Sequence, residues 1–426
     1  MKFNKWTLGL AAVGVISLTS AACADDKLNA LQTALSNTAI SGYVSASMNW
    51  AISGQAQYTG SGNYPEGSSP AYFIPFQGGF KQDGFNLDVV KLSISKPEDE
   101  SSWASGYQVD LLFGPDAVAY NSSIAPIGYH NGSSGADFAI KQAYVSLRTP
   151  IGNGIDWKVG VFDSPLGYEV FDAGSNPNYT RSWGYYLEPT ELTGVLASYK
   201  INDEWSASAG VANTLSAGIN NRDNESGFGD GAGSYWHKTV MGSAAFSAPS
   251  SWGWAAGSSF YAGVVYGFAD GNYYGNSPVT DERANGYQAN YYLGATMNTP
   301  WKQLTTGVAF DYVHNFLGGD EDYWGDAWSL GLYATYKATD KLSLNARGEY
   351  VEGTYYNAGG GGDNDNLVEF TGTVEYDLWA NVVSRLELRW DHLLSNTGFG
   401  IPYVADYGEA DKRTSVGFYA NIIFKF

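Results

Sequence analysis

The chain has 426 residues, of which 43 are Asp or Glu and 23 are Lys or Arg, so its formal net charge at pH 7 is -20. Such acidity excludes the basic surfaces that bind nucleic acid, and a single cysteine excludes a disulfide framework. Aromatic residues make up 15% of the chain and glycine occurs 53 times, which favours one long unit rich in tight turns over several soluble domains.

The N-terminus has the layout of a secretory signal peptide. Lys2 and Lys5 precede an apolar run that ends at Leu18, and small residues follow up to Ala24. The apolar run is too short to span a bilayer as a helix. We therefore interpret residues 1–24 as a signal peptide that is removed during export.

Cleavage after Ala24 would leave a mature chain without cysteine. Its formal charge would be 21 - 43 = -22, because the signal peptide holds two lysines and no acidic residue. The alternative is lipidation of Cys23. We disfavour it because Ser20 stands where a lipoprotein signal usually carries leucine.

Residues 25–39 form a short leader ahead of the first strand. Leu28, Leu31 and Leu35 fall on one helical face, which predicts a short amphipathic helix at the periplasmic mouth. A leader without regular structure is the alternative. The leader is too short to hold a folded plug domain of the kind that an energy-coupled receptor needs.

Residues 40–426 repeat a two-residue alternation of apolar and polar side chains, most clearly in the last strand from Val416 to Phe426. A soluble sandwich would cover that apolar face with a second layer, whereas a closed barrel turns it to lipid and satisfies every backbone group within the sheet. We therefore predict an all-β fold, a transmembrane antiparallel up-and-down β-barrel of about sixteen strands. The expected strands are Ile40–Ile52, Phe85–Ser95, Gly106–Phe113, Phe138–Arg148, Ile155–Phe162, Leu192–Lys200, Trp205–Thr214, Lys238–Ser247, Gly253–Phe268, Tyr287–Asn298, Leu304–His314, Ala327–Lys337, Leu342–Glu352, Leu367–Trp379, Ser384–Leu394 and Lys412–Phe426.

The connections between these strands alternate in length. Brief turns such as Asn202–Glu204 and Ala338–Lys341 are each followed, one strand later, by a longer loop. This asymmetry is typical of outer-membrane barrels, which have short periplasmic turns and long external loops. Six tryptophans beside the short turns predict an aromatic girdle at the periplasmic interface. These are Trp103, Trp157, Trp205, Trp252, Trp301 and Trp379.

The connection after the fifth strand is the most distinctive internal stretch. Gly160–Glu169 reads Gly-x-Phe-x-Ser-x-x-Gly-Tyr-Glu, and Asn178–Ser182 reads Asn-Tyr-Thr-Arg-Ser. This pair of motifs resembles the β-barrel porin-2 (OmpL-like) family of bacterial outer-membrane porins. The final strand, which ends in Phe426, is similar to the C-terminal signal of bacterial outer-membrane proteins. The resemblance implies a porin and names no solute.

This connection is expected to fold inward, as in general diffusion porins, because a sixteen-stranded barrel is wide enough to leave an aqueous lumen. Acidic residues of the loop are then expected to face Arg347 and Arg389 across a narrow passage, which creates a transverse field that orients polar solutes. The alternative is that both arginines pair with neighbouring acids along the wall. The expected constriction set is Asp163, Glu169, Asp172, Arg181, Glu188, Arg347, Glu349, Glu387, Arg389 and Asp391.

Catalytic and cofactor sites find little support in the sequence. His314 and His392 lie on apolar faces without a serine two residues further along the same face, where a nucleophile could pair with them. The run Gly227–Gly233 lacks the Lys-Ser/Thr of a phosphate loop. Asp363 and Asp365 lack the glycine and distal glutamate of a helix-loop-helix calcium site. We therefore expect no enzyme activity, no metal and no cofactor.

The sequence thus predicts an outer-membrane porin that forms a passive aqueous channel for small hydrophilic solutes or ions. A barrel for hydrophobic substrates is one alternative, although it would need an apolar lumen. A plugged structural or adhesive barrel is the other. The expected partners are outer-membrane lipid and lipopolysaccharide, the barrel-assembly machinery at the C-terminal strand, and further copies of this chain, since trimers are common among porins of this size.

Overall fold

The computed structural model describes residues 38–53, 81, 83–99, 101–120, 138–215, 219–220, 238–269, 286–315, 324–356, 362–394 and 414–426. Outside this description lie the expected signal peptide with Cys23, the leader up to residue 37, His130, the glycine-rich run 227–233, His237, and the side chains of Asp363 and Asp365. Among the helices of the described residues, none is long and apolar enough to cross a bilayer.

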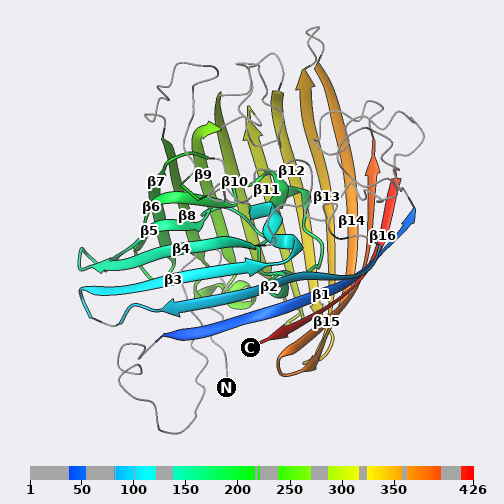
Figure 1. Cartoon of the computed structure of the whole chain (residues 1–426), viewed down its shortest axis with the longest axis horizontal. Helices are drawn as coiled ribbons and strands as arrows, with labels where there is room; N and C mark the ends of the chain where they lie inside the picture. The colour runs from blue at the N-terminus through cyan, green and yellow to red at the C-terminus, as the bar shows by residue number, and fades with distance from the viewer. Residues whose placement is uncertain are drawn as a thin grey trace.

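The described residues form sixteen strands in one closed antiparallel barrel, in which each strand pairs with its sequence neighbours and the last pairs with the first (Figure 1). This confirms the predicted fold. The strands are β1 (Ala39–Ser53), β2 (Gly84–Lys96), β3 (Ala104–Phe113), β4 (Phe138–Thr149), β5 (Ile155–Asp163), β6 (Glu191–Lys200), β7 (Trp205–Ala212), β8 (Thr239–Ser247), β9 (Ser259–Ala269), β10 (Gly286–Asn298), β11 (Leu304–His314), β12 (Trp324–Lys337), β13 (Leu342–Tyr356), β14 (Gly362–Trp379), β15 (Val382–Leu393) and β16 (Thr414–Lys425).

The barrel closes where β16 meets β1. The register runs from Tyr43 opposite Lys425 to Trp50 opposite Phe418 without interruption. Beyond it, the backbone N–H of Phe426 donates to the carbonyl of Gly42, and the N–H of Gly42 donates to the carbonyl of Phe426, both at 2.9 Å. Backbone groups at the seam therefore find partners within the sheet, as the interior of a bilayer requires.

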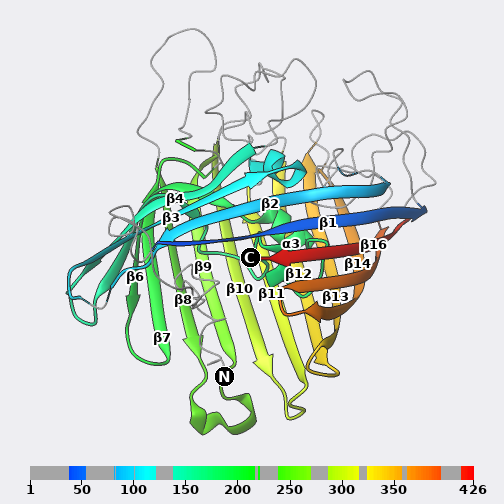
Figure 2. The same ribbon diagram turned by 60° about the horizontal axis from the view of Figure 1, so that its bottom comes forward.

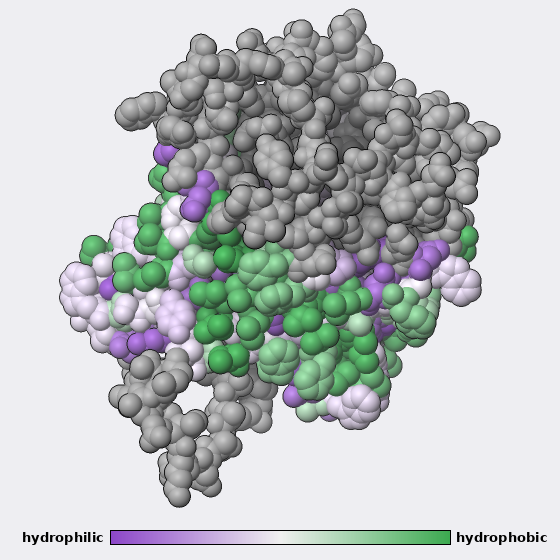
Figure 3. Space-filling view, in the orientation of Figure 1, coloured by the Kyte–Doolittle hydropathy of each residue, from purple (hydrophilic) through white to green (hydrophobic). Residues whose placement is uncertain are grey.

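Side chains alternate between the two faces of the sheet, and the two faces differ in character. On β15, Leu386 and Leu388 are exposed on the outside, whereas Arg385, Glu387 and Arg389 point inward and are buried. Apolar residues gather over the strands on the face seen in Figure 3. The expected arrangement, an apolar exterior around a polar interior, therefore holds where the sequence alternates most strictly.

The start of β9 differs from the prediction. We expected a strand from Gly253, yet residues Ser250–Ala255 form the 3-10 helix η4 and the strand begins at Ser259. The reason is local backbone geometry, since Gly253 (φ 63°) and Gly257 (φ 78°) adopt positive φ angles far from the extended backbone of a regular strand. The apolar side chain of Trp254 therefore belongs to a longer turn between β8 and β9.

The tryptophans beside the short turns face outward. Trp103, Trp205, Trp252, Trp301 and Trp379 are all exposed. Trp157 is half-buried, and its indole N–H donates to the hydroxyl of Thr149 at 3.0 Å. This placement is the one that an interfacial girdle needs.

The connection between β5 and β6 runs through the interior of the barrel. It contains the short 3-10 helix η3 (Ala173–Ser175) and the one-turn helix α3 (Trp183–Leu187). Helix α3 packs against β11, β12 and β13, far around the barrel from β5, and lies within the ring of strands in Figure 2. A second 3-10 helix, η1 (Pro115–Tyr120), packs against β2, β3 and β4. We call residues 164–190 the inner loop.

Candidate functional site: the inner loop and the barrel walls

The Gly-Tyr-Glu part of the sequence motif docks on β12 and β13. Gly167 has φ 121°, a conformation that favours glycine, and this turns the chain toward the far wall. The ring of Tyr168 stacks on that of Tyr333 with the centroids 4.2 Å apart. Glu169 Oε1 lies 2.9 Å from Arg347 Nη1 and forms an ion pair with it. Each residue of this part of the motif therefore has a role in docking.

The Asn-Tyr-Thr-Arg-Ser part docks in the same way on other strands. The amide of Asn178 donates to the Thr373 hydroxyl at 2.7 Å, and the hydroxyl of Tyr179 donates to Asp88 Oδ1 at 2.9 Å. Ser182 Oγ accepts a backbone N–H of α3 at 3.0 Å and thereby caps that helix. The motif thus encodes both the shape of the inner loop and its attachment.

Carboxylates of the wall accept backbone N–H groups of the inner loop. Glu349 accepts from the N–H of Trp183 at 2.9 Å, at the start of α3. Glu387 accepts from the N–H groups of Tyr179 at 2.6 Å and Thr180 at 2.9 Å. A buried irregular segment must satisfy its backbone donors somewhere, and charged acceptors form the stronger hydrogen bonds.

Arginines of the wall donate in return to carbonyls of the inner loop. Arg347 Nη1 donates to the carbonyl of Thr180 at 2.8 Å, and Arg389 Nη1 to that of Arg181 at 2.6 Å. Arg385 donates to two further carbonyls, those of Ala173 and Asn176. The planar guanidinium can bind a carbonyl and a carboxylate at once, which a lysine cannot reproduce.

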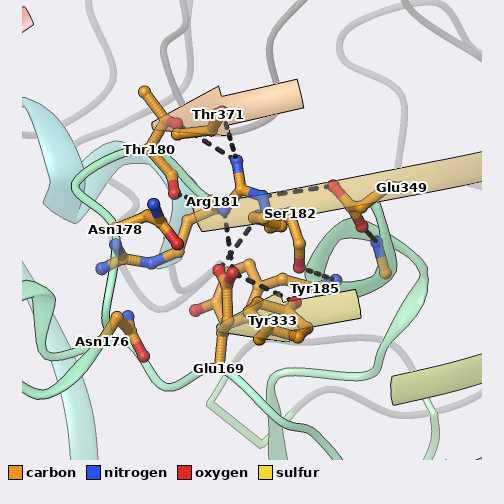
Figure 4. A network of polar contacts seen from close by, with 12 residues as sticks. Glu169, Asn176, Asn178, Thr180, Arg181, Ser182, Tyr185, Tyr333, Glu349 and Thr371 are labelled. Carbon is orange, nitrogen blue, oxygen red and sulfur yellow. Dashed lines mark hydrogen bonds and ion pairs between the residues drawn. The ribbon is translucent and has the colours of Figure 1, made fainter. Parts of the chain in front are cut away.

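These groups form one buried network, part of which is seen in Figure 4. Arg347 pairs with Glu369 at 3.2 Å and Arg389 with Asp391 at 2.8 Å, and the side chains of all four residues are at most 2% exposed. Arg181 donates to the carbonyls of Tyr179 and Phe171 within the loop itself. We call this network the buried clamp: Glu169, Arg181, Arg347, Glu349, Glu369, Glu387, Arg389 and Asp391.

The clamp differs from the constriction that the sequence led us to expect. Arg347 and Glu169 touch, so no passage separates these two charges, and Arg389 contacts the loop backbone instead of an acidic side chain of the loop. The reason is that the inner loop reaches the wall itself and excludes water from the space between. The alternative interpretation was that both arginines pair with neighbouring acids along the wall. The structure shows these pairs too, since Arg347 pairs with Glu369 and Arg389 with Asp391.

Apolar contacts hold the inner loop around the whole barrel. Leu166 packs in a cluster with inward residues from β5 through β12. Phe171 and Ala173 pack in a second cluster with residues of β1 to β4 and β16, and Trp183 in a third with β13, β14 and β15. Through these three clusters the inner loop is packed into apolar groups whose wall residues come from all parts of the barrel.

Two further acids of the expected set, one at the end of β5 and one in the inner loop, lie in a more accessible region. Asp163 pairs with Lys141, and Asp172 pairs with Lys91 at 2.9 Å. The side chains of Asp163 and Asp172 are 41% and 38% exposed, so solvent reaches them inside the barrel. Lys91 also lies 3.3 Å from Asp110. We call Lys91, Asp110, Lys141, Asp163 and Asp172 the charged wall.

The basic members of the charged wall were missed at the sequence level. Lys91 on β2 and Lys141 on β4 both fall among polar residues of the inward face, which is the signal that could have found them. Lys141 is harder to assign because a register shift next to it in the β3–β4 pairing interrupts strict alternation. The charged wall thus joins β2, β3, β4 and β5 to the inner loop.

Glu188, near the end of the inner loop, is not part of the clamp. It keeps some exposed surface, yet its carboxyl lies against Gly167, where an added Cβ would meet Oε2 at 2.3 Å. Burial raises the pKa of the Glu188 carboxyl well above its usual range, and the nearby charge of Asp311 raises it further. Glu188 is therefore a titratable contact between the loop and β11.

The two described histidines face outward and are engaged in pairs. His314 Nδ1 lies 2.8 Å from Asp326 Oδ1, and His392 Nδ1 lies 2.7 Å from the Thr414 hydroxyl. Within the described residues, no group of three or more His, Cys, Asp or Glu side chains has the arrangement of a metal site. The chemistry of the interior therefore comes from the clamp and the charged wall.

A closed sixteen-stranded barrel with an apolar exterior, a polar interior and an inward-folded loop defines a porin of the bacterial outer membrane. The chain belongs to the family described as "Putative beta-barrel porin-2, OmpL-like", whose model matches residues 38–426. This confirms the family that the motifs of the inner loop indicated.

Solved structures with the same fold are porins of distant sequence. An OmpF complex with daunomycin from Salmonella typhi is 11% identical with a TM-score of 0.56, covering 91% of this chain and 97% of that one. An anion-selective porin from Comamonas acidovorans is 12% identical with a TM-score of 0.55, covering 91% and 99%. The trimer form of OmpT from Vibrio cholerae is 14% identical with a TM-score of 0.54, also covering 91% and 99%. A search among curated proteins gave no match.

Proposed function

We propose that this porin is a passive aqueous channel for small hydrophilic solutes and works without a cofactor or energy coupling. The observation that carries the proposal is the accessibility of Asp163 and Asp172, which contrasts with the closed clamp on another part of the wall. Charged groups along a narrow water-filled path favour hydrophilic solutes and disfavour apolar ones. The solute path therefore follows the charged wall, and the expected constriction reduces to Asp163 and Asp172 with their lysine partners.

Swelling of liposomes that contain the purified protein tests this proposal. We expect swelling in solutions of small polyols and sugars, at rates that fall steeply with solute size because the inner loop crosses the lumen. Protein-free liposomes are the control. A barrel that admitted only apolar solutes would contradict the proposal.

The second candidate is the plugged barrel. It is favoured by one observation, the packing of inner-loop residues into three separate apolar clusters of the barrel interior. If no solute of any size permeates and planar bilayers show no current, the barrel is plugged and its role is structural or adhesive. Stepwise current increments on insertion would exclude this candidate.

We propose a homotrimer as the assembled form. Support comes from the size of the barrel and from the structural neighbour whose title names a trimer form. The mass of the protein extracted in mild detergent, after correction for bound detergent, tests this. A monomer at every protein concentration would contradict it.

We propose that the chain is exported with residues 1–24 as a cleaved signal peptide and that the barrel-assembly machinery recognises the strand ending at Phe426. The exposed apolar exterior would then contact outer-membrane lipid, and the external loops would contact lipopolysaccharide. The mature protein should begin at Asp25, which mass spectrometry can check. A lipidated Cys23 at the N-terminus would contradict the cleavage site, and normal assembly after deletion of Phe426 would contradict its role.

A further inference from the structure

Lys158 is an inward-facing cation on the same side of the barrel as the charged wall. It lies on β5 next to Val159, which points outward, and its register partner on β4 is Ser146. The residue is only 7% exposed. Asp163 follows five residues later, so the two positions are roughly 16 Å apart along the strand at about 3.3 Å per residue.

Lys158 differs from the neighbouring lysines in its lack of an anionic partner. Lys91 and Lys141 each contact a carboxylate directly. Within the part of the chain that the structure describes, the ammonium of Lys158 makes no hydrogen bond or ion pair, and its one polar contact is the ring of Tyr144, with the nitrogen 4.8 Å from the centroid. Lysines this deeply buried are almost always paired, so an unpaired one needs an explanation.

The nitrogen of Lys158 is nevertheless open to the lumen. It is not among the fully enclosed polar atoms of the described residues that lack a hydrogen-bond partner, so part of the nitrogen is accessible although the residue as a whole is buried. A buried stem with an accessible charged end is the usual arrangement of a lysine beside an aqueous space. An anion that passes this point can therefore reach the ammonium.

The sequence builds this position through Gly160. Its φ is 136°, and a Cβ there would lie 2.3 Å from the carbonyl oxygen of Ala143, so no larger side chain fits. Tyr144 is the register partner of Gly160 on β4. Because Gly160 has no side chain, the inward face of the sheet has room here for the ring of Tyr144 and for Lys158, whose nitrogen lies over that ring. Gly160 opens the motif that identified the family, and this contact gives it a physical role.

We propose that Lys158, supported by the ring of Tyr144, is an anion-binding position on the solute path and favours the passage of small anions. The proposal rests on the proposed channel function and names the solute class that it favours. An ammonium without a counter-ion, held partly out of water, attracts anions strongly.

Reversal potentials of the full-length protein in planar bilayers test the proposal. In a gradient of potassium acetate, the permeability of acetate relative to potassium should fall about threefold or more in Lys158→Met, which keeps the length of the side chain and removes the charge. Lys158→Arg should restore the ratio, because the charge returns.

The matched control is Lys200→Met. Lys200 is an exposed lysine at the end of β6 that pairs with Asp203 in a short turn, and its removal should leave the ratio unchanged. The heat-dependent electrophoretic mobility of each variant shows that its barrel has folded. If wild type conducts and Lys158→Met has the same acetate ratio, the inference is wrong while the channel stands. If wild type does not conduct at all, the proposed function itself fails.

Discussion

The buried clamp and the charged wall both combine acidic and basic residues and lie on different parts of the wall of one lumen, yet they differ in what surrounds the charges. In the clamp, the side chains of Arg347 and Glu369 are not exposed at all. In the charged wall, Asp163 is 41% exposed while its partner Lys141 is almost fully buried. Both regions attach the inner loop, so the difference in burial separates ion pairs that are closed to solvent from ion pairs that solvent reaches.

The choice of cation follows the same division. The clamp uses arginine, and Arg347 alone donates to Glu169, to Glu369 and to the carbonyl of Thr180. The charged wall uses lysine, which offers a point charge and can be approached by small ions. The clamp therefore holds the inner loop in one position, while the charged wall leaves charge available to the lumen.

The largest effect is expected from Arg347→Met, which tests whether the clamp holds the loop. The substitution leaves Glu169, Glu349 and Glu369 buried without their main counter-ion, and breaking such a buried pair typically costs about 3–5 kcal/mol. We expect a lower temperature of unfolding, and larger, noisier single-channel currents as the loop leaves the wall.

The exposed pair of Lys200 with Asp203 supplies the control, since Lys200→Met should change stability by no more than about 1 kcal/mol. Unchanged currents in Arg347→Met would show that the apolar clusters alone fix the inner loop. The clamp would then be dispensable for docking, and its contrast with the charged wall would lose its meaning.

The barrel could be predicted from the sequence because each strand carries its own two-residue alternation of apolar and polar side chains, which can be recognised without knowing its neighbours. Alternation placed fourteen of the sixteen strand starts within three residues, and the start of β14 five residues late. It failed at β9, where the positive φ angles of Gly253 and Gly257 leave no trace in the hydrophobic pattern. The motif between β5 and β6 indicated the family and the loop. The period of a sequence does not reveal how far a loop extends into the lumen. We therefore expected an open passage between Glu169 and Arg347, where the structure shows an ion pair.

The second prediction concerns the charged wall and separates selectivity from stability. In Asp172→Asn, Lys91 keeps its contact with Asp110, so stability should change by less than about 1 kcal/mol. The loss of an accessible negative charge should raise the permeability of anions relative to cations about twofold. Reversal potentials in a salt gradient measure this ratio. The same ratio in both proteins would place the solute path away from Asp172.

The smallest effect is expected at Glu188, which belongs to neither region and tests whether the inner loop responds to pH. Its pKa is raised, chiefly by burial, so the docked loop holds the proton more tightly than a free loop would. The stability contributed by this contact is complete below the ordinary pKa of a glutamate, and it is lost as pH rises through the raised value.

Current noise should therefore increase from acidic toward alkaline pH in the wild type and stay flat in Glu188→Gln, which cannot ionise. Glu188 lies beside Gly167, two residues before Glu169 of the clamp, so its ionisation should disturb the loop near Glu169. The pair of Asp163 with Lys141 should stay in place. Selectivity should consequently stay constant over the pH range in which noise rises. A parallel change in selectivity would mean that the charged wall also depends on the position of the clamp, so the two regions would act as one.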